Sequence, residues 1–278
     1  MSRTDPAARP DSSPSPVLRV GLLGLGRMGR AVRDALEERG HEVALVVDPS
    51  WGPDPGPGRA IRLEPGLLDG VDVVIDVSTG PAVPGHAEAC ARSGTPLVVG
   101  ATGWDDDRPG VEERARNAGI GLLVAPNFSL GVNLFFRMVR HAARLVNAAD
   151  PRDAALHEAH HRHKADHPGG TARRLAEILV EELDGKTGWT TELPAGSPFD
   201  PQVLQVGVTR AGEIPGTHRV VLDGPADTLE LVHTARSREG FARGAVAAAE
   251  WIHGRTGVFT MEDLLDDLTG STPDAPPA

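Results

Sequence analysis

Apolar and polar residues alternate in blocks along the first half of the chain, as in a parallel α/β fold. Apolar runs cover residues 18–23, 42–47, 71–79, 95–104 and 120–129, with helix-like segments between them. Strands buried on both faces of a parallel sheet read as such continuous runs. The pattern predicts repeated βα units around a parallel sheet, with ligands bound beyond the carboxyl ends of the strands.

The pattern changes beyond residue 127. A final helix is expected over the Ala-rich amphipathic segment FARGAVAAAEWIHG, and the sequence alone allows it to pack against either domain. A helix from Thr171 to Leu183 is expected because its apolar residues follow a 3.6-residue period. We predict a smaller α+β domain with a mixed or antiparallel sheet. A long helix is expected near 131–146, and strands are expected near 153–160, 203–209, 217–223 and 228–235.

Three glycines with the spacing G-x-G-x-x-G follow the first apolar run. Gly24 permits a tight turn, Gly26 lets a pyrophosphate approach the backbone, and Gly29 lets helix and strand pack closely. An ordinary strand-turn-helix connection shows the same spacing, so the βα context carries the interpretation. We predict a dinucleotide-binding loop.

Asp48 ends the second apolar run, about 20 residues further on, where a carboxylate binds the adenosine ribose. A carboxylate repels a 2'-phosphate and therefore favours NADH over NADPH, whereas Arg27 and Arg30 reduce that preference. The alternative is that Asp48 only forms a turn before Pro49. Four polar residues at later strand ends are placed near the cofactor by topology, or are turn residues: Ser78, Thr79, Thr102 and Asn127.

Composition narrows the choice of partners. No apolar run approaches the roughly 20 residues of a membrane helix. The net charge of -11 and the absence of a Lys/Arg-rich run argue against nucleic acid and anionic membranes. Cys90 stands alone, so no intrachain disulfide is expected. Residues 1–16 lack the apolar core of a signal peptide, which predicts a disordered extension and a cytoplasmic protein.

The segment EAHHRHKADHPGGTA, residues 158–172, concentrates imidazoles around one lysine. Five of the eleven histidines lie between residues 157 and 167. His160, His161 and His163 are too close along a strand to converge on one ion, and no H-E-x-x-H spacing occurs, so no metal is predicted. An exposed histidine-rich loop remains the plain alternative.

Proton transfer uses more of this segment. Histidine titrates near neutral pH, and Lys164 lies among other cations, so both can act as acids. The PGGT turn opens a helix and presents free backbone amides and the Thr171 hydroxyl to an anion. We therefore expect a small acidic substrate, held against a nicotinamide between two domains.

The same segment resembles the signature E-x-H-H-x-x-K-x-D-x-P-S-G-T-A of the 4-hydroxy-tetrahydrodipicolinate (dihydrodipicolinate) reductase family. Further stretches are similar in the same order, from about residue 18 to 265: GLGRMGR, VVIDVST, VVGATGW, APNFSLGVN, EIPGTHRV and ARSREGFARGAVAAAEWI. The resemblance implies hydride transfer from NADH or NADPH to C4 of a cyclic imine dicarboxylate with loss of water. The product is tetrahydrodipicolinate, in diaminopimelate and lysine biosynthesis.

The resemblance also implies an architecture and a set of site residues. A Rossmann-type domain over 17–128 and 241–278 receives an inserted substrate and oligomerisation domain over 129–240, and the assembly is a homotetramer. His160 is implied as the catalytic acid/base and Lys164 as the proton donor. His163 is implied as a supporting residue and Arg238 as a residue near the substrate. Substrate carboxylate contacts are implied for His161, Gly170 and Thr171, and cofactor contacts for Gly24, Leu25, Gly26, Arg27, Met28, Gly29, Asp48, Gly100, Ala101, Thr102, Ala125, Pro126, Asn127 and Phe128.

Three positions depart from the family pattern. Ala101 replaces a threonine, Gly169 replaces a serine, and His167 replaces an alanine. Losing one neutral hydrogen bond at residue 169 would weaken binding several-fold at most. Two alternatives stay open: a dehydrogenase of similar architecture acting on another amino or imino acid, and a dinucleotide-sensing module without catalysis. Either would be expected to lack part of the combination of His160, Lys164 and the Gly170-Thr171 pair.

Overall fold

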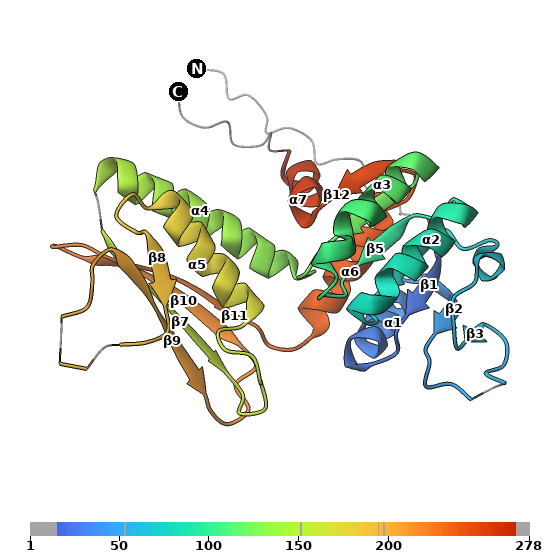
Figure 1. The fold of residues 1–278 in the computed structure, drawn as a ribbon, viewed down its shortest axis with the longest axis horizontal. Coiled ribbons are helices and arrows are strands. Elements are labelled where there is room, and N and C mark those ends of the chain that lie inside the picture. Colours follow the sequence, from blue (N-terminus) through green and yellow to red (C-terminus); the bar gives the residue numbers. More distant parts are fainter. Residues whose placement is uncertain (1–15, 53, 151, 194, 197, 271–278) are drawn as a thin grey trace, which may run out of the picture.

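The computed structural model describes residues 16–270, except 53, 151, 194 and 197. The sequence folds into two α/β bodies that lie next to each other (Figure 1). The predicted disorder of residues 1–16 concerns residues that, apart from residue 16, lie outside the described part, as does the tail 271–278. No helix in the described part has the length and apolar composition needed to cross a membrane.

The first body is built on a parallel sheet. In the described part this sheet has seven strands in the order β12-β6-β5-β4-β1-β2-β3. The predicted βα alternation is confirmed, because the apolar runs form its central strands and are buried at nearly every position. The strands are β1 (Arg19–Leu23), β2 (Glu42–Val47), β3 (Arg59–Ala60), β4 (Val73–Asp76), β5 (Leu97–Val99), β6 (Gly121–Val124) and β12 (Gly257–Phe259).

Helices cover both faces of this sheet. The α1 and α6 helices share one apolar core with it, and α2 and α3 share the other. Both α2 and α3 end at a glycine in the left-handed region, Gly94 (φ 72°) and Gly119 (φ 66°), which stops the helix before the next strand. The helices are α1 (Arg27–Glu38), α2 (Val83–Ser93), α3 (Arg108–Ala118), α6 (Glu239–Ile252) and α7 (Met261–Thr269), with 3-10 turns at Pro65–Leu68, Gly80–Ala82 and Asp105–Asp107.

The second body contains a mixed sheet of five strands in the described part, ordered β11-β10-β7-β9-β8. The central strand β7 pairs antiparallel with β10 and parallel with β9, which confirms the expected α+β arrangement. Helices α4 and α5 pack on one face of this sheet and form a separate apolar core. The elements are α4 (Leu130–Ala149), β7 (Asp153–His160), α5 (Gly170–Glu182), β8 (Gly188–Thr190), β9 (Val203–Arg210), β10 (Thr217–Asp223) and β11 (Thr228–Thr234).

After the second body is complete, the chain returns to the first sheet. Helix α6 packs against α1 and the strands β4, β5 and β6. The contact with the connection between the bodies is close, because a Cβ at Gly244 would lie 1.8 Å from the carbonyl oxygen of Phe128. A residue with a side chain at position 244 would therefore push α6 away from this connection.

Three short strands were not predicted from the sequence pattern. They are the edge strands β3, β8 and β12, each two or three residues long. A segment of that length shows no recognisable period, and only the neighbouring strand defines it.

Candidate active site

The glycine loop between β1 and α1 has the shape that its spacing predicts. Gly24 has a φ of 88°, and a Cβ there would lie 2.8 Å from the backbone of Ser78. A Cβ at Gly29 would lie 1.9 Å from the carbonyl oxygen of Gly24. By contrast, apart from Gly26 itself and its chain neighbours, no described atom lies within 4 Å of the place that a Cβ would take at Gly26, the N-cap of α1. The loop is tight where it meets protein and open at the helix N-terminus, so it fits a pyrophosphate.

Asp48 follows β2 and is held beside this loop. Its Oδ2 accepts a hydrogen bond from the Leu25 amide at 2.6 Å, and its Oδ1 accepts one from the Ser50 amide at 2.9 Å. Partial burial opposes ionisation, but hydrogen bonds from Ser50 and Leu25 and the charge of Arg30 outweigh it, so the pKa of Asp48 is lowered. The Asp48 carboxylate therefore both supports the glycine loop, through Leu25, and forms the local turn, through Ser50.

The predicted cofactor residues after β5 and β6 divide into two groups. Thr102, Pro126 and Asn127 are at least partly exposed, whereas Ala125 and Phe128 are buried in the apolar core. Gly100 is required here, because a Cβ would lie 2.2 Å from the ring of Phe128. The carbonyl oxygen of Ala101, itself buried, accepts a hydrogen bond from the Trp104 indole. Only the backbone of these buried residues is available to a cofactor.

Asn127 joins the first body to the second. Its side-chain amide donates a hydrogen bond to the Thr171 hydroxyl at 3.2 Å, and its Oδ1 accepts one from the Ser129 amide at 2.9 Å. Asn133, on α4, donates to the carbonyl oxygens of Asn127 and Ser129 at 2.9 Å each. A residue predicted to bind the cofactor and a residue predicted to bind the substrate are thus in direct contact.

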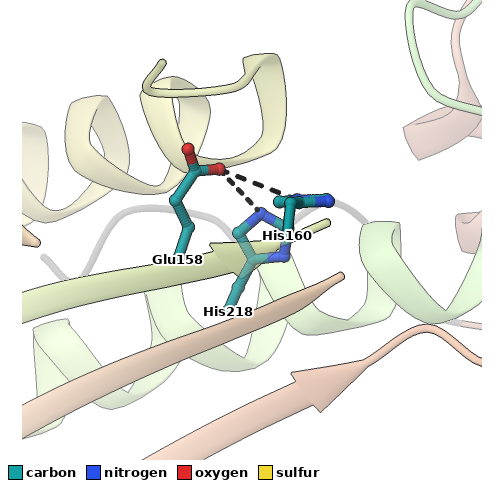
Figure 2. Close-up of side chains that lie close together, drawn as sticks. All are labelled: Glu158, His160 and His218. Atoms are coloured by element: carbon teal, nitrogen blue, oxygen red, sulfur yellow. Dashed lines mark ion pairs between the residues drawn. The ribbon is translucent and has the colours of Figure 1, made fainter. Parts of the chain in front are cut away.

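His160, at the end of β7, lies against two buried polar side chains (Figure 2). Its Nε2 is 3.8 Å from Oε2 of Glu158, and Nε2 of His218 on β10 is 3.6 Å from the same oxygen. A Cβ at Gly216 would lie 2.7 Å from the His160 ring, so only glycine leaves room for it. Burial, then the nearby His218 and Lys164, lower the pKa of His160 to about 4. The imidazole is therefore neutral at pH 7.

Glu158 anchors this part of the site although its side chain is fully buried. Its Oε1 accepts hydrogen bonds from Arg210 at 2.6 Å and from the Gly169 amide at 3.0 Å. Burial favours the neutral acid, but His218, Arg210 and the Gly169 amide outweigh it and lower the pKa of Glu158 to about 2. Arg210 also donates to the carbonyl oxygens of Lys164 and Asp166, and so ties the loop after β7 to the sheet.

Lys164 lies in that loop and is mostly shielded from solvent. Its Nζ donates to both carboxylate oxygens of Asp166, at 2.7 and 2.8 Å. A Cβ at Gly169 would lie 2.8 Å from Cε of Lys164 and 3.1 Å from both its Nζ and Oε2 of Glu158, so a side chain here would require the end of the lysine to move. Gly169 is the N-cap of α5, and its neighbour Gly170 is open to solvent.

The remaining predicted substrate residues surround this loop. His161 is partly buried, and its ring packs edge-on against that of His160, with centroids 6.4 Å apart. His163 and His167 are exposed, and His163 lies 3.8 Å from the carboxylate of Glu213. Arg238 is exposed at the N-cap of α6. The structure therefore places His161 and Lys164 near His160, and the Lys164 side chain against Gly169, the residue before Gly170 and Thr171. His163 and His167 lie at the surface.

Sequence reasoning missed three members of the site: Glu158, Arg210 and His218. Glu158 is the first residue of the EAHHRHKADHPGGTA segment, in which His160, His161 and His163 are the neighbouring histidines that a metal site would suggest. In the described residues, the group whose ligand atoms do converge is Glu158, His160 and His218. The signal was present only in the strand register, which places His218 opposite Glu158.

A parallel sheet with an open glycine loop at a helix N-terminus, next to a second sheet that carries clustered histidines, is the arrangement expected of a nicotinamide-dependent oxidoreductase. Profiles described as "Dihydrodipicolinate reductase, N-terminus" and "Dihydrodipicolinate reductase, C-terminus" match residues 18–128 and 131–265. The chain belongs to the dihydrodipicolinate reductase family.

Curated relatives span nearly the whole chain. It is 34% identical to a 4-hydroxy-tetrahydrodipicolinate reductase of Christiangramia forsetii, over 90% of this chain and 99% of that protein. It is 38% identical to one of Archaeoglobus fulgidus, over 90% of this chain and all of that protein.

Solved structures share the two-body architecture. A dipicolinate-bound dihydrodipicolinate reductase from Paenisporosarcina superposes with a TM-score of 0.71 at 23% identity, over 88% of this chain and 97% of that one. A probable dehydrogenase from Thermotoga maritima gives 0.55 at 13% identity, over 88% and 92%. At these identities the likeness concerns the fold alone.

Proposed function

We propose that the chain reduces 4-hydroxy-tetrahydrodipicolinate to tetrahydrodipicolinate in diaminopimelate and lysine biosynthesis. The observation that carries the proposal is the Asn127–Thr171 contact, which joins the cofactor edge of the first sheet to a site with a lysine, an imidazole and an open helix N-terminus. A dicarboxylate is the expected ligand of those groups. The reaction consumes one hydride and one proton and releases water.

The residue roles follow from protonation and position. The Gly170 amide and the Thr171 hydroxyl at the start of α5, together with His161, hold a substrate carboxylate. The ammonium of Lys164 supplies the proton that the reaction consumes. His160 is proposed as the acid/base residue beside Lys164. Its pKa, lowered to about 4, leaves the imidazole neutral at pH 7, so it adds no charge to the site.

A nicotinamide cofactor supplies the hydride when it is bound. Gly24 to Gly29 cradle its pyrophosphate at the start of α1, with Leu25, Arg27 and Met28 lining the loop. Asp48 binds the adenosine ribose and favours NADH over NADPH. Residues at the ends of β5 and β6 contact the nicotinamide, through side chains at Thr102 and Asn127 and through the backbone at Gly100, Ala101, Ala125, Pro126 and Phe128.

The domain organisation is proposed as 17–128 with 241–278 for the cofactor and 129–240 for the substrate. Two observations support it: α6 shares a core with β1 and α1, and the second sheet has a core of its own with α4 and α5. The assembly is proposed to be a homotetramer formed through the second sheets. On the face opposite α4 and α5, Val232 is 54% exposed within a single chain. Light scattering of the purified protein measures the assembly.

The test is oxidation of NADH and of NADPH with substrate formed in situ from pyruvate and aspartate semialdehyde. Turnover establishes the reaction and gives the cofactor preference in the same experiment. Folded protein that binds dinucleotide but turns over neither cofactor would contradict the proposal. A screen of other imino acids would then separate a dehydrogenase of different substrate from a sensing module.

A further inference from the structure

The Glu158, His160 and His218 cluster has lone pairs that protein groups do not use. Oε2 of Glu158 and both ring nitrogens of His218 are buried and have no hydrogen-bond partner among the described residues. Oε2 of Glu158 lies 3.6 Å from Nε2 of His218 and 3.8 Å from Nε2 of His160, and both distances are too long for hydrogen bonds. Buried polar atoms without partners are uncommon and indicate a missing ligand or water.

The separations suit atoms that bind one metal ion. Zn²⁺ holds nitrogen and oxygen ligands at about 2.0 to 2.2 Å in a tetrahedron, which places the ligands about 3.3 to 3.6 Å from one another. The three ligand atoms here all lie within 4.8 Å of one another, so small side-chain rotations would bring them to the separations that one ion requires. Two imidazoles and one carboxylate form the ligand set of many zinc enzymes.

The charges around the cluster leave it available to a cation. Arg210 binds the other carboxylate oxygen, Oε1, and Lys164 is paired with both oxygens of Asp166. Oε2, the oxygen that faces His160 and His218, accepts no hydrogen bond from the described residues.

We propose that Glu158, His160 and His218 form a Zn²⁺ site, and that zinc bound there inhibits the enzyme by occupying Nε2 of His160. That Zn²⁺ binds here is argued from the geometry alone. That bound zinc inhibits the enzyme rests on the proposed function. It differs from the sequence expectation of no metal, because two of its three ligands lie outside the set of neighbouring histidines that was considered.

Metal binding is measured first, with Co²⁺ as the probe on metal-free full-length protein. One Co²⁺ per chain should give the intense visible absorption of a tetrahedral or five-coordinate ion, and Zn²⁺ should remove it. His218→Gln should weaken Co²⁺ binding at least about 100-fold, because even loss of a second-shell partner costs about 10- to 100-fold. A His163→Gln, His167→Gln double variant is the matched control, since both side chains are exposed, and should bind as the wild type does.

Inhibition is measured next, as the Zn²⁺ concentration that halves the initial rate, with recovery on adding EDTA. Wild type and the control variant should be inhibited equally, and His218→Gln should need at least tenfold more Zn²⁺, relative to its own uninhibited rate. A wild-type protein that leaves Co²⁺ octahedral, or a control variant that alone loses binding, overturns the site. Bound Co²⁺ in a protein without reductase activity would uphold the site and contradict the proposed function instead.

Discussion

The side-chain amide of Asn127 donates a hydrogen bond to the hydroxyl of Thr171 at 3.2 Å, across the junction of the two bodies. Asn127 follows β6 in the first sheet, and Thr171 lies in the first turn of α5 in the second. Each residue has a partner that fixes it: the Ser129 amide binds Oδ1 of Asn127, and α5 holds Thr171. The positions of cofactor and substrate groups are thereby linked through one hydrogen bond.

Replacing this hydroxyl tests the link. Thr171→Val keeps the shape of the side chain but removes both the acceptor for Asn127 and the proposed contact to the substrate carboxylate, so kcat/KM should fall about tenfold or more. Thr171→Ser keeps the hydroxyl and should stay close to wild type. Equal kcat/KM for the valine and serine variants would remove the Asn127–Thr171 contact from the mechanism.

Lys164 is the predicted proton donor. Lys164→Ala should lower kcat by about 10² or more, which is the scale of lost general-acid catalysis, while NADH binding measured by fluorescence stays unchanged. His163→Gln, an exposed substitution one residue away, is the control and should leave kcat near wild type. A lysine variant with near-normal kcat would show that another group donates the proton.

Asp48 has two roles that two variants can separate. Asp48→Ser and Asp48→Asn both remove the charge, so the ratio of kcat/KM for NADPH to that for NADH should rise in both. Only the asparagine keeps an oxygen in place to accept the Leu25 amide, so it should bind either cofactor more tightly than the serine does. An unchanged ratio in both variants would mean that the carboxylate does not contact the ribose.

The ion pairs of Glu182, at the contact between α4 and α5, should make the free energy of unfolding depend on pH. Glu182 binds Arg144 at 2.8 Å and also Arg140. The hydrogen bond from Arg144 lowers the pKa of Glu182. Burial opposes this shift, but the hydrogen bond from Arg140 adds to it, so the pKa is lowered overall. A lowered folded-state pKa stabilises the protein above the unfolded value of about 4.3, and this contribution is lost as the pH falls through the folded value.

Glu182→Gln should therefore reduce the free energy of unfolding by about 1 to 2 kcal/mol at pH 7, measured by urea denaturation. The difference from wild type should shrink as the pH drops below about 4. Glu177→Gln removes an exposed carboxylate on the same helix and should change stability little. A Glu182 effect that is constant from pH 7 to pH 3 would show that charge is not its cause.

Most of the fold can be predicted from the sequence because the central strands are buried along their whole length and therefore appear as continuous apolar runs. The strand β6, Gly121–Val124, is buried at every position, so its apolar run is visible in the sequence. The strand β3, Arg59–Ala60, is two residues long and half-exposed, and exists because β2 pairs with it. Local pattern finds the first kind of element and cannot find the second, whose stability comes from a partner distant in sequence.

The same distinction divides the site. His160, Lys164 and Thr171 come from one short segment, so a motif collects them. His218 meets Glu158 only through the register of β10 on β7, and Arg210 reaches Glu158 from β9. Gly169 shows a further limit: the sequence indicates only a lost serine hydrogen bond, whereas the structure also places the end of the Lys164 side chain against this glycine.

The return of α6 to the first sheet has a consequence for synthesis on the ribosome. Its residues Ala242, Ala245, Val246 and Ile252 complete the core formed by β1 and α1. Until residue 252 has emerged, that face of the sheet stays uncovered, while the second body, from Leu130 to Thr234, already has its own helices and strands. The body whose chain is made first is therefore the last to close its core, and a message truncated before α6 would yield an exposed apolar sheet for chaperones and proteases.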